Sequence, residues 1–252
     1  MNIAGSKAES DYRWEVVAPA REISNNSSVS EATSGFLAEL SEFRGRILHA
    51  GGRRPSFTRE GGRFADDDPL DLESFHVTVR ADGALIGCAR VTPLPEYSRS
   101  HIGQWRGPSR LESAVDLMNL ARTDCAEAGR WLVAPSARGA LLGRTLLLTL
   151  WVTGQWLGKR CLLGAVGMRD GQSKMVSRCG GRIAPGMDPV FVEEYDDELS
   201  VMYFDLDHPP PEVARELGRV RCLLKVPGDL YKSSMEHLAP GRPASVSYMG
   251  KP

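Results

Sequence analysis

Two charged side chains come just before the most informative stretch of the sequence. Glu127 and Arg130 precede residues 131–134, a short apolar run of strand character that Pro135 and Ser136 interrupt. A carboxylate beside a buried strand can have its pKa raised by burial, which suits it to accept a proton near neutral pH. The alternative is an exposed Glu–Arg pair at a helix end, which contributes little to stability.

The residues after this turn predict a helix that can hold an anion. From Arg138 the sequence is apolar nearly all round, which is typical of a buried helix. The first turn of such a helix leaves backbone N–H groups without partners and carries the positive end of the helix dipole, so it can bind a phosphate. Gly139 and Gly143 would let backbone or ligand approach closely.

This segment resembles the acyl-donor loop of the GNAT acyltransferase superfamily, Arg/Gln-x-x-Gly-x-Gly/Ala after a strand. Arg138 and Gly143 match its first and last positions, and Leu141 replaces its middle glycine. Glu127-x-x-Arg130 followed by an aromatic residue resembles the Glu-x-Ser-Arg-Phe signature of the autoinducer-synthase branch. That branch includes acyl-homoserine-lactone synthases and N-acyl amino acid synthases.

Three further motifs resemble the same branch and stand in its order. They are Arg44-Gly-Arg-Ile-Leu48, Asp68-Pro-Leu-Asp71 and Gly87-Cys-Ala-Arg90, similar to its Arg-x-x-Val-Phe helix end, Asp-x-x-Asp pair and Gly-x-x-Arg strand. The resemblance runs from Arg44 to about Gly180. Two positions depart from it, because Leu48 and Arg54 stand where the branch has Phe and Trp in its acceptor and acyl pocket.

The resemblance implies an α/β protein with the GNAT (acyl-CoA N-acyltransferase) fold, a mixed twisted sheet flanked by helices. It implies an enzyme that moves an acyl group from a thioester to an amine by direct attack, without a covalent intermediate. Glu127 would be the general base, directly or through a water, and Arg130 would steady it or the acceptor. Backbone N–H groups at the end of the strand would stabilise the oxyanion. The acyl-donor site would comprise Trp131, Val133, Arg138, Gly139, Gly143 and Arg144.

The acceptor site implied by the resemblance comprises Asp68, Asp71, Arg90 and Arg44. Asp68 and Asp71 would face the cationic amine, or they are only an Asx-turn pair. Arg90 either positions a substrate carboxylate or is a structural ion-pair partner of these aspartates. Leu48 and Arg54 favour an amino acid or a similar small-molecule amine as acceptor. S-adenosylmethionine, which would make the protein an acyl-homoserine-lactone autoinducer synthase, is the alternative.

The donor would be a co-substrate, acyl-ACP (acyl carrier protein) or acyl-CoA, with no permanently bound cofactor and no metal. A CoA diphosphate benefits from both loop glycines, whereas a carrier protein presents one phosphodiester, so Leu141 favours acyl carrier protein as the partner. Two further possibilities are a plain acetyltransferase and a non-catalytic protein that binds a carrier protein through a GNAT fold.

The composition, with 42% hydrophobic residues among 252, is that of a globular protein. The net charge of −1 gives the chain as a whole no electrostatic attraction to nucleic acid or to an anionic membrane. No apolar run is long enough to span a bilayer. Arginines crowd residues 44–63, which is either a solvated loop or a docking face for an acidic carrier protein. The scattered cysteines indicate reduced core thiols and a bacterial cytoplasmic setting (Cys88, Cys125, Cys161, Cys179 and Cys222).

The pattern of elements predicts one domain over residues 11–228, a flexible N-terminus over residues 1–10 and a loosely attached tail over residues 229–252. Strands are expected over residues 12–18, 75–79, 84–91, 131–134, 160–166, 201–206 and 220–226. Helices are expected over about 28–48, 111–120 and 138–157, before Gly180, and after Pro211. Residues 98–107 and 185–198 show little regular pattern.

Overall fold

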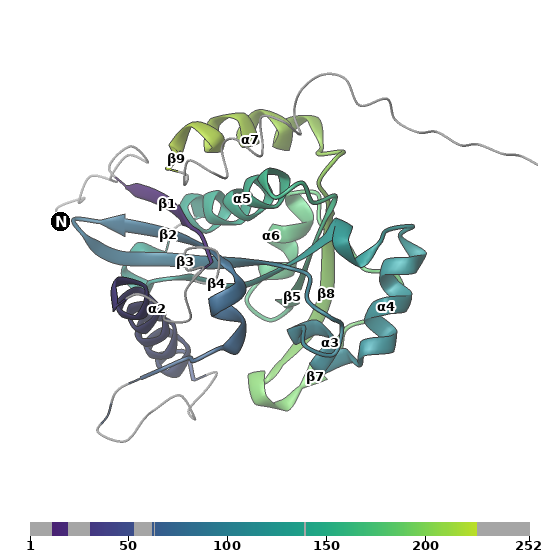
Figure 1. The fold of residues 1–252 in the computed structure, drawn as a ribbon, viewed down its shortest axis with the longest axis horizontal. Helices are drawn as coiled ribbons and strands as arrows, with labels where there is room; N and C mark the ends of the chain where they lie inside the picture. Colours follow the sequence, from purple (N-terminus) through teal and green to yellow (C-terminus); the bar gives the residue numbers. More distant parts are fainter. Residues whose placement is uncertain (1–11, 20–30, 53–61, 63, 139, 226–252) are drawn as a thin grey trace, which may run out of the picture.

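The described part of the chain forms a mixed sheet with helices on both faces. The computed structural model describes residues 12–19, 31–52, 62, 64–138 and 140–225. The strands are β1 (Arg13–Val17), β2 (Phe75–Ala81), β3 (Ala84–Pro93), β4 (Cys125–Val133), β5 (Cys161–Gly167), β6 (Arg182–Ile183), β7 (Val190–Val192), β8 (Asp197–Asp205) and β9 (Leu224–Lys225). They follow the order β6-β8-β5-β4-β3-β2-β1-β9, with β7 paired to β8 (Figure 1).

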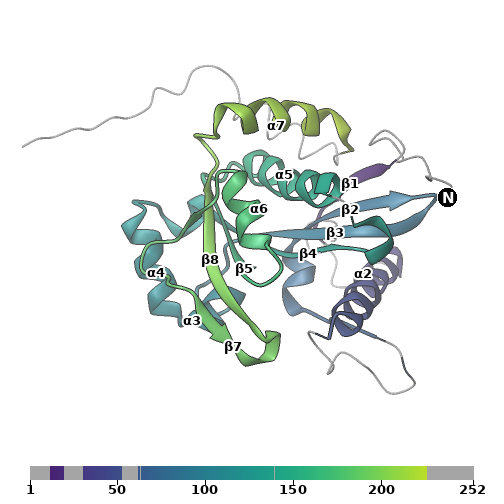
Figure 2. The ribbon, with the colours of Figure 1, turned by 180° about the vertical axis from the view of Figure 1, so that it is seen from behind.

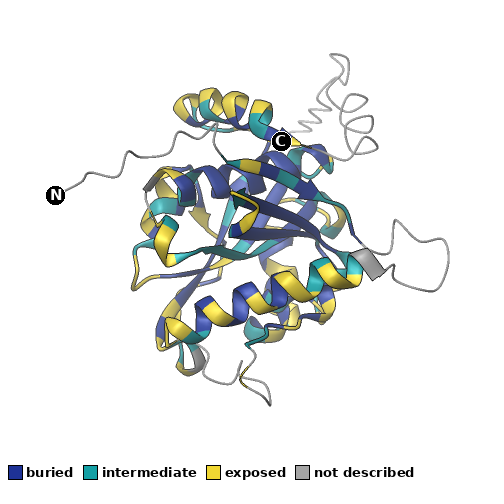
Figure 3. Cartoon of the chain, turned by 90° about the vertical axis from the view of Figure 1, so that its left-hand side faces the viewer, coloured by how far each residue is buried: buried dark blue, intermediate teal, exposed yellow. Residues whose placement is uncertain are grey.

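The helices are α2 (Glu31–Ala50), α3 (His101–Arg106), α4 (Pro108–Leu117), α5 (Ala140–Trp156), α6 (Gln172–Arg178) and α7 (Pro211–Leu223). Helices α5 and α7 lie over one face of the sheet and α2 over the other (Figures 1 and 2). Helix α2 presents Leu40, Phe43 and Ile47, at helical spacing, to Leu85 and Cys88 of β3. The strands are buried between helices whose outer faces are exposed (Figure 3).

Two packing clusters hold the centre of the sheet. Helix α5, rich in leucine, packs with β1 to β5, β8 and α7 in the largest cluster. On the opposite face, Ile102 of α3 and Leu111 of α4 belong to a second cluster. It includes Cys125 of β4, and Cys161 and Leu163 of β5. Adjacent residues of one strand point to opposite faces, so Leu162 belongs to the α5 cluster while Leu163 belongs to the α3–α4 cluster.

Strands β4 and β5, at the centre of the sheet, are paired over only part of their length. Strand β4 pairs in parallel with β5 only from Cys125 to Ala128, although β5 continues to Gly167. In the antiparallel pairing with β3 the register shifts after Cys88, and Arg130 has φ 54°, which marks a β-bulge with one extra residue on β4. The bulge bends β4 away from β5, so the two strands diverge beyond Ala128.

Most expected elements are confirmed, with shifted ends. The hairpin of β2 and β3 and the helix that begins at Pro211 lie as predicted. The strand expected over residues 131–134 is longer and begins at Cys125, because Cys125 and Ala126 are buried on opposite faces of the sheet. The helix expected from Arg138 begins at Ala140, after a 3₁₀ turn over Pro135–Ala137.

Three expectations were wrong. The strand predicted over residues 220–226 is mostly the end of α7, because Val213, Leu217 and Val220 recur at helical spacing and bury one helix face, which leaves only β9 as strand. Residues 98–107 contain α3, and residues 185–198 contain β7 and a 3₁₀ turn. The proposed N-terminal segment 1–10 and tail 229–252 lie outside the described residues.

Candidate active site

A pocket of about 450 Å³ lies where β4 and β5 diverge. On the α3 side its lining includes Glu127, His101, Gln104 and Trp105. On the α5 side the lining is apolar and includes Leu147, Leu150, Val176, Met202 and Phe204. Since these residues belong to helices and strands on both faces of the sheet, the pocket runs through the opening between the two strands. One end is polar and the other can accept a chain of methylenes.

Glu127 is a buried carboxylate with unused hydrogen-bonding capacity. It lies inside β4 and is 4% exposed, so the alternative of an exposed helix-end pair is wrong. Its Oε2 atom has no hydrogen-bond partner. Burial raises the pKa of Glu127, against the opposing effects of His101, Arg90 and the backbone N–H groups of His101 and Ile102. A pocket-lining carboxylate with a raised pKa and a free oxygen can take a proton from a bound substrate.

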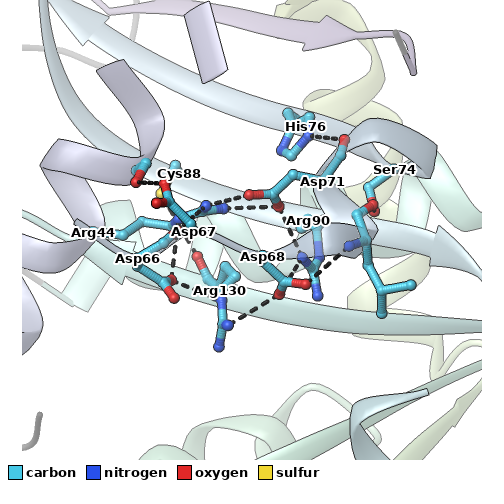
Figure 4. A network of polar contacts seen from close by, with 12 residues as sticks. Arg44, Asp66, Asp67, Asp68, Asp71, Ser74, His76, Cys88, Arg90 and Arg130 are labelled. Carbon is cyan, nitrogen blue, oxygen red and sulfur yellow. Dashed lines mark hydrogen bonds and ion pairs between the residues drawn. The ribbon is translucent and has the colours of Figure 1, made fainter. Parts of the chain in front are cut away.

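The predicted acceptor residues converge on one buried ion-pair network (Figure 4). Arg44 binds Asp71 through both terminal nitrogens, and its Nε lies 3.2 Å from Asp66 Oδ2. Arg90 Nη1 donates to Asp68 Oδ2 at 2.6 Å and to Asp71 Oδ1 at 2.8 Å. Arg90 therefore forms the expected ion pairs with both aspartates, and because it also lines the pocket, its binding of a substrate carboxylate stays a prediction.

Arg130 lies at the β-bulge of β4, and its side chain is part of the same ion-pair network. Its left-handed φ of 54° at the bulge is uncommon for a residue with a side chain. The guanidinium lies 2.8 Å from Asp66 Oδ2 and 3.0 Å from Asp68 Oδ2. Arg130 therefore stabilises the network, and its predicted role toward Glu127 or the acceptor stays a prediction. The sequence pattern did not reveal Asp66 as a member of the site.

The network fixes the charge of its aspartates. Burial alone would raise the pKa of Asp68, but a hydrogen bond from His101 and the charges of Arg90 and Arg130 outweigh it and hold the pKa well below its ordinary range. Burial would likewise raise the pKa of Asp71, but the hydrogen bond and charge of Arg44 outweigh it and lower this pKa. Asp68 Oδ1 also accepts from the Leu70 N–H, which is the Asx-turn geometry. Binding of the acceptor's amine by Asp68 and Asp71 stays a prediction.

The predicted donor residues follow β4 into α5. Trp131 lines the pocket, and its Nε1 donates to the Gly143 carbonyl at 3.1 Å. Arg138 is exposed at the end of the 3₁₀ turn. Arg144 forms a bidentate ion pair with Glu216 of α7, with both contacts at 2.8 Å. Gly139 lies outside the described residues. The structure therefore gives Arg144 a partner other than a phosphate.

One of the backbone N–H groups at the end of β4 already donates a hydrogen bond within the sheet. The Ala134 N–H donates to the Ile86 carbonyl at 2.8 Å. Because N–H groups alternate in direction along a strand, the Val133 N–H points away from β3, toward the side from which β5 has diverged. Val133 is thus the better candidate for an oxyanion donor.

His101 is the pocket residue that the sequence interpretation missed. Its Nε2 atom lies 2.6 Å from Asp68 Oδ2. It begins α3, whose N-cap Ser100 accepts from the Gly103 N–H at 2.8 Å. The Ser100 cap is a sequence signal that could have predicted this short helix.

Leu48, the cysteines and the expected absence of a metal site or a membrane span can be described from the structure as follows. Leu48 is buried and lines the pocket, whereas Arg54 is not described. Cys222 is exposed, so the expectation that all cysteines are core thiols was wrong for α7. Within the described ranges no His, Cys, Asp and Glu group has the arrangement of a metal site. No helix in those ranges combines the length and hydropathy needed to cross a bilayer.

Solved structures resemble this one over most of its length. TofI, in a ternary complex with an inhibitor and MTA, matches with TM-score 0.58 and 19% identity over 82% of this chain and 96% of its own. BjaI, a CoA-dependent acyl-homoserine lactone synthase with MTA, matches with TM-score 0.62 and 13% identity over 89% of this chain and 99% of its own. The chain has the fold of the acyl-homoserine-lactone synthases. The GNAT-type fold expected from the sequence is thereby confirmed.

The AHL synthase LasI also matches, with TM-score 0.52 and 14% identity over 77% of this chain and 89% of its own. No family model and no curated protein matches the chain. The likeness thus lies in the arrangement of strands and helices, and the chemistry has to be argued from the pocket.

Proposed function

We propose that this protein is an N-acyltransferase that moves a fatty acyl group from a thioester to the amine of an amino-acid-like acceptor. The observation that carries the proposal is Glu127, a buried carboxylate with a free oxygen at the polar end of a pocket whose other end is apolar. A thioester carbonyl placed between these ends would direct its acyl chain toward α5 and its reacting carbon toward Glu127. The fold, shared with acyl-homoserine-lactone synthases, agrees with this chemistry.

Once the acceptor nitrogen is a free amine, attack on the thioester needs one proton acceptor and one oxyanion donor. The attacking nitrogen must lose a proton as it bonds to the carbonyl carbon, and Glu127 is placed to receive it. Charge then builds on the carbonyl oxygen, and the Val133 N–H, on the edge of β4 that faces away from β3, would donate to it. Collapse of the tetrahedral intermediate expels the thiol. The steps require no covalent bond to the protein.

The acceptor we favour is an amino acid or a similar amine. Leu48 lines the pocket, and a leucine there fills less space than the Phe of the autoinducer-synthase motif. The second candidate is an acyl-homoserine-lactone synthase that uses S-adenosylmethionine. The match to BjaI, which extends over 99% of that synthase, favours this candidate, and a related structure of BjaI holds SAM and isopentyl-CoA.

For the donor we favour acyl carrier protein, with acyl-CoA as the alternative. Leu141, 62% exposed in the first turn of α5, occupies the loop position of the middle glycine that a CoA diphosphate would approach. MesI and BjaI are CoA-dependent synthases with this fold, so the fold accommodates that donor. Catalytic efficiencies measured with matched acyl-carrier and acyl-CoA thioesters test the preference, and equal values would contradict it.

Mass spectrometry of organic extracts tests the function. Bacteria would express the wild type, Glu127→Gln, or Glu198→Gln, which changes an exposed glutamate of β8 and serves as the control. Acylated amines should accumulate with the wild type and Glu198→Gln and be absent with Glu127→Gln. The product masses identify acyl chain and acceptor, and an N-acyl homoserine lactone would establish the second candidate. The same extract profile for all three proteins would contradict N-acyl transfer by Glu127.

A further inference from the structure

N-acyl transfer to an amine has a proton balance that one base does not complete. An amino-acid-like acceptor arrives as an ammonium ion, with three protons on nitrogen, and the amide product keeps one. Two protons therefore leave the nitrogen. One goes to the leaving sulfur, which departs as a thiol, and the other is released to solvent. The pocket has to provide a route for each.

His101 has the arrangement of an oriented base. Asp68 is held ionised by its cationic neighbours, so its Oδ2 can only accept a hydrogen bond. The Nε2 atom of His101, 2.6 Å from that oxygen, must then carry the hydrogen. In the neutral ring the lone pair is therefore on Nδ1, for which no hydrogen bond is found among the described residues. A carboxylate that fixes the tautomer of an imidazole and stabilises its cation is a recurrent arrangement in enzymes.

His101 and Glu127 differ in their access to solvent. Both line the pocket, but the His101 side chain is 38% exposed and Glu127 is 4% exposed. A proton on His101 can pass to water, whereas a proton on Glu127 is held inside the pocket. The exposed group thus suits the proton that leaves the protein, and the buried group suits the proton that the departing sulfur receives.

We propose, resting on the N-acyltransferase function above, that His101 is a second proton-transfer residue of this pocket. Its Nδ1 removes the first proton from the acceptor's ammonium group and passes it to solvent. The free amine then attacks the thioester carbonyl, Glu127 takes the second proton from the nitrogen, and the C–S bond breaks as that proton moves to sulfur. Asp68 is a positioning residue that holds the His101 ring.

The surroundings of the ring agree with this role. The charged groups near it are Asp68, which caps the 3₁₀ turn Pro69–Glu73 before β2, Arg90 on β3, and Arg130 and Glu127 on β4. Both guanidiniums share Asp68 Oδ2 with His101, so their charge is directed to the carboxylate. The backbone of α3, which carries His101, packs closely on the preceding segment, because a Cβ at Gly103 would overlap the Tyr97 carbonyl oxygen.

The test compares His101→Gln with the wild type by thiol release over pH 6 to 9. Octanoyl-CoA and the octanoyl carrier-protein thioester serve as donors, with S-adenosylmethionine and the free amino acids as acceptors. Glutamine keeps a donor for Asp68 but cannot titrate. We expect roughly 100-fold lower kcat/KM at neutral pH, and a deficit that shrinks as rising pH supplies free amine from solution. His208→Gln, at an exposed position in the bend after β8, serves as the control.

The outcomes separate this inference from the function. A His101→Gln enzyme that equals the wild type at every pH, or one whose deficit does not depend on pH, overturns the proton-transfer role while leaving N-acyl transfer intact. A wild type that releases no thiol with any acceptor contradicts the function itself. Nitrogen NMR of the ring provides a readout without turnover. We expect the Nε2–H tautomer in the wild type and its loss in Asp68→Asn, and a ring that carries its hydrogen on Nδ1 would overturn the proposal.

Discussion

His76 makes the stability of this protein depend on pH near neutrality. The ring is buried beneath Phe36, 5.8 Å from it edge to face, and its Nε2 hydrogen-bonds to the Asp71 carbonyl at 2.9 Å. Burial lowers the pKa of His76 from 6.5 to about 4, against the attraction of Asp71. Because the folded state prefers the neutral ring, this contribution to stability is complete above the unfolded pKa and is lost as pH falls toward the folded one.

The size of the effect follows from the two pKa values. A shift from 6.5 to about 4 corresponds to about 3 kcal/mol in full. Linkage predicts that about 2 kcal/mol of it is lost between pH 7 and pH 5. Glutamine at position 76 keeps an N–H for the Asp71 carbonyl and does not titrate, so His76→Gln is the matched comparison.

The assay is urea unfolding of both proteins at pH 7 and pH 5. Carboxylates contribute equally to the two proteins and cancel in the difference. The wild type should lose about 2 kcal/mol more than His76→Gln between these pH values. Parallel losses in the two proteins would mean that the folded state accepts a charged ring at position 76, contrary to the lowered pKa of His76.

Three further predictions concern the network and the pocket. Arg90→Met should lower the free energy of unfolding by about 3 to 5 kcal/mol, since it leaves Asp68 and Asp71 buried without a shared cation; Arg90→Lys, which keeps the charge, should lose less in the same urea titration. Because the pKa values of Asp68 and Asp71 are lower in the folded state than the unfolded value of 3.8, the free energy of unfolding should fall as pH drops below about 4. Asp68→Asn should make this loss at acid pH smaller in a titration followed by circular dichroism. Val176→Phe should fill the apolar end of the pocket and reduce kcat/KM for long acyl chains by roughly tenfold or more relative to short ones; an unchanged chain-length profile would place the acyl chain elsewhere.

The sequence predicted the parts of this fold that depend on local pattern. The β2–β3 hairpin follows from alternation and a turn, and α5 from a continuous apolar run. The structure brings the charged side chains of the separate motifs together, and short motifs do not state which of these charges pair. The sequence left open whether the aspartates face a substrate amine or form a turn, and whether Arg90 pairs with them; the structure shows ion pairs with Arg44, Arg90 and Arg130.

The remaining features depend on tertiary structure. The bulge at Arg130 requires a left-handed backbone at a residue with no local preference for it, so no sequence signal marks it. The pocket exists because that bulge separates β4 from β5, and this separation is a property of three strands together. His101 reaches the pocket from a helix of six residues, too short to show periodicity.

The proposed N-acyl transfer requires that Glu127 accept a proton from the attacking amine. The most direct test is thiol release from a fatty acyl thioester by purified protein, followed against pH for the wild type and Glu127→Gln. We expect wild-type activity to rise through an apparent pKa above the ordinary carboxyl range, because burial raises the pKa of Glu127. Glu127→Gln should lose roughly 100-fold or more of the activity on the high-pH side of that rise. A Glu127→Gln enzyme with near-full turnover and the same pH profile would contradict this requirement.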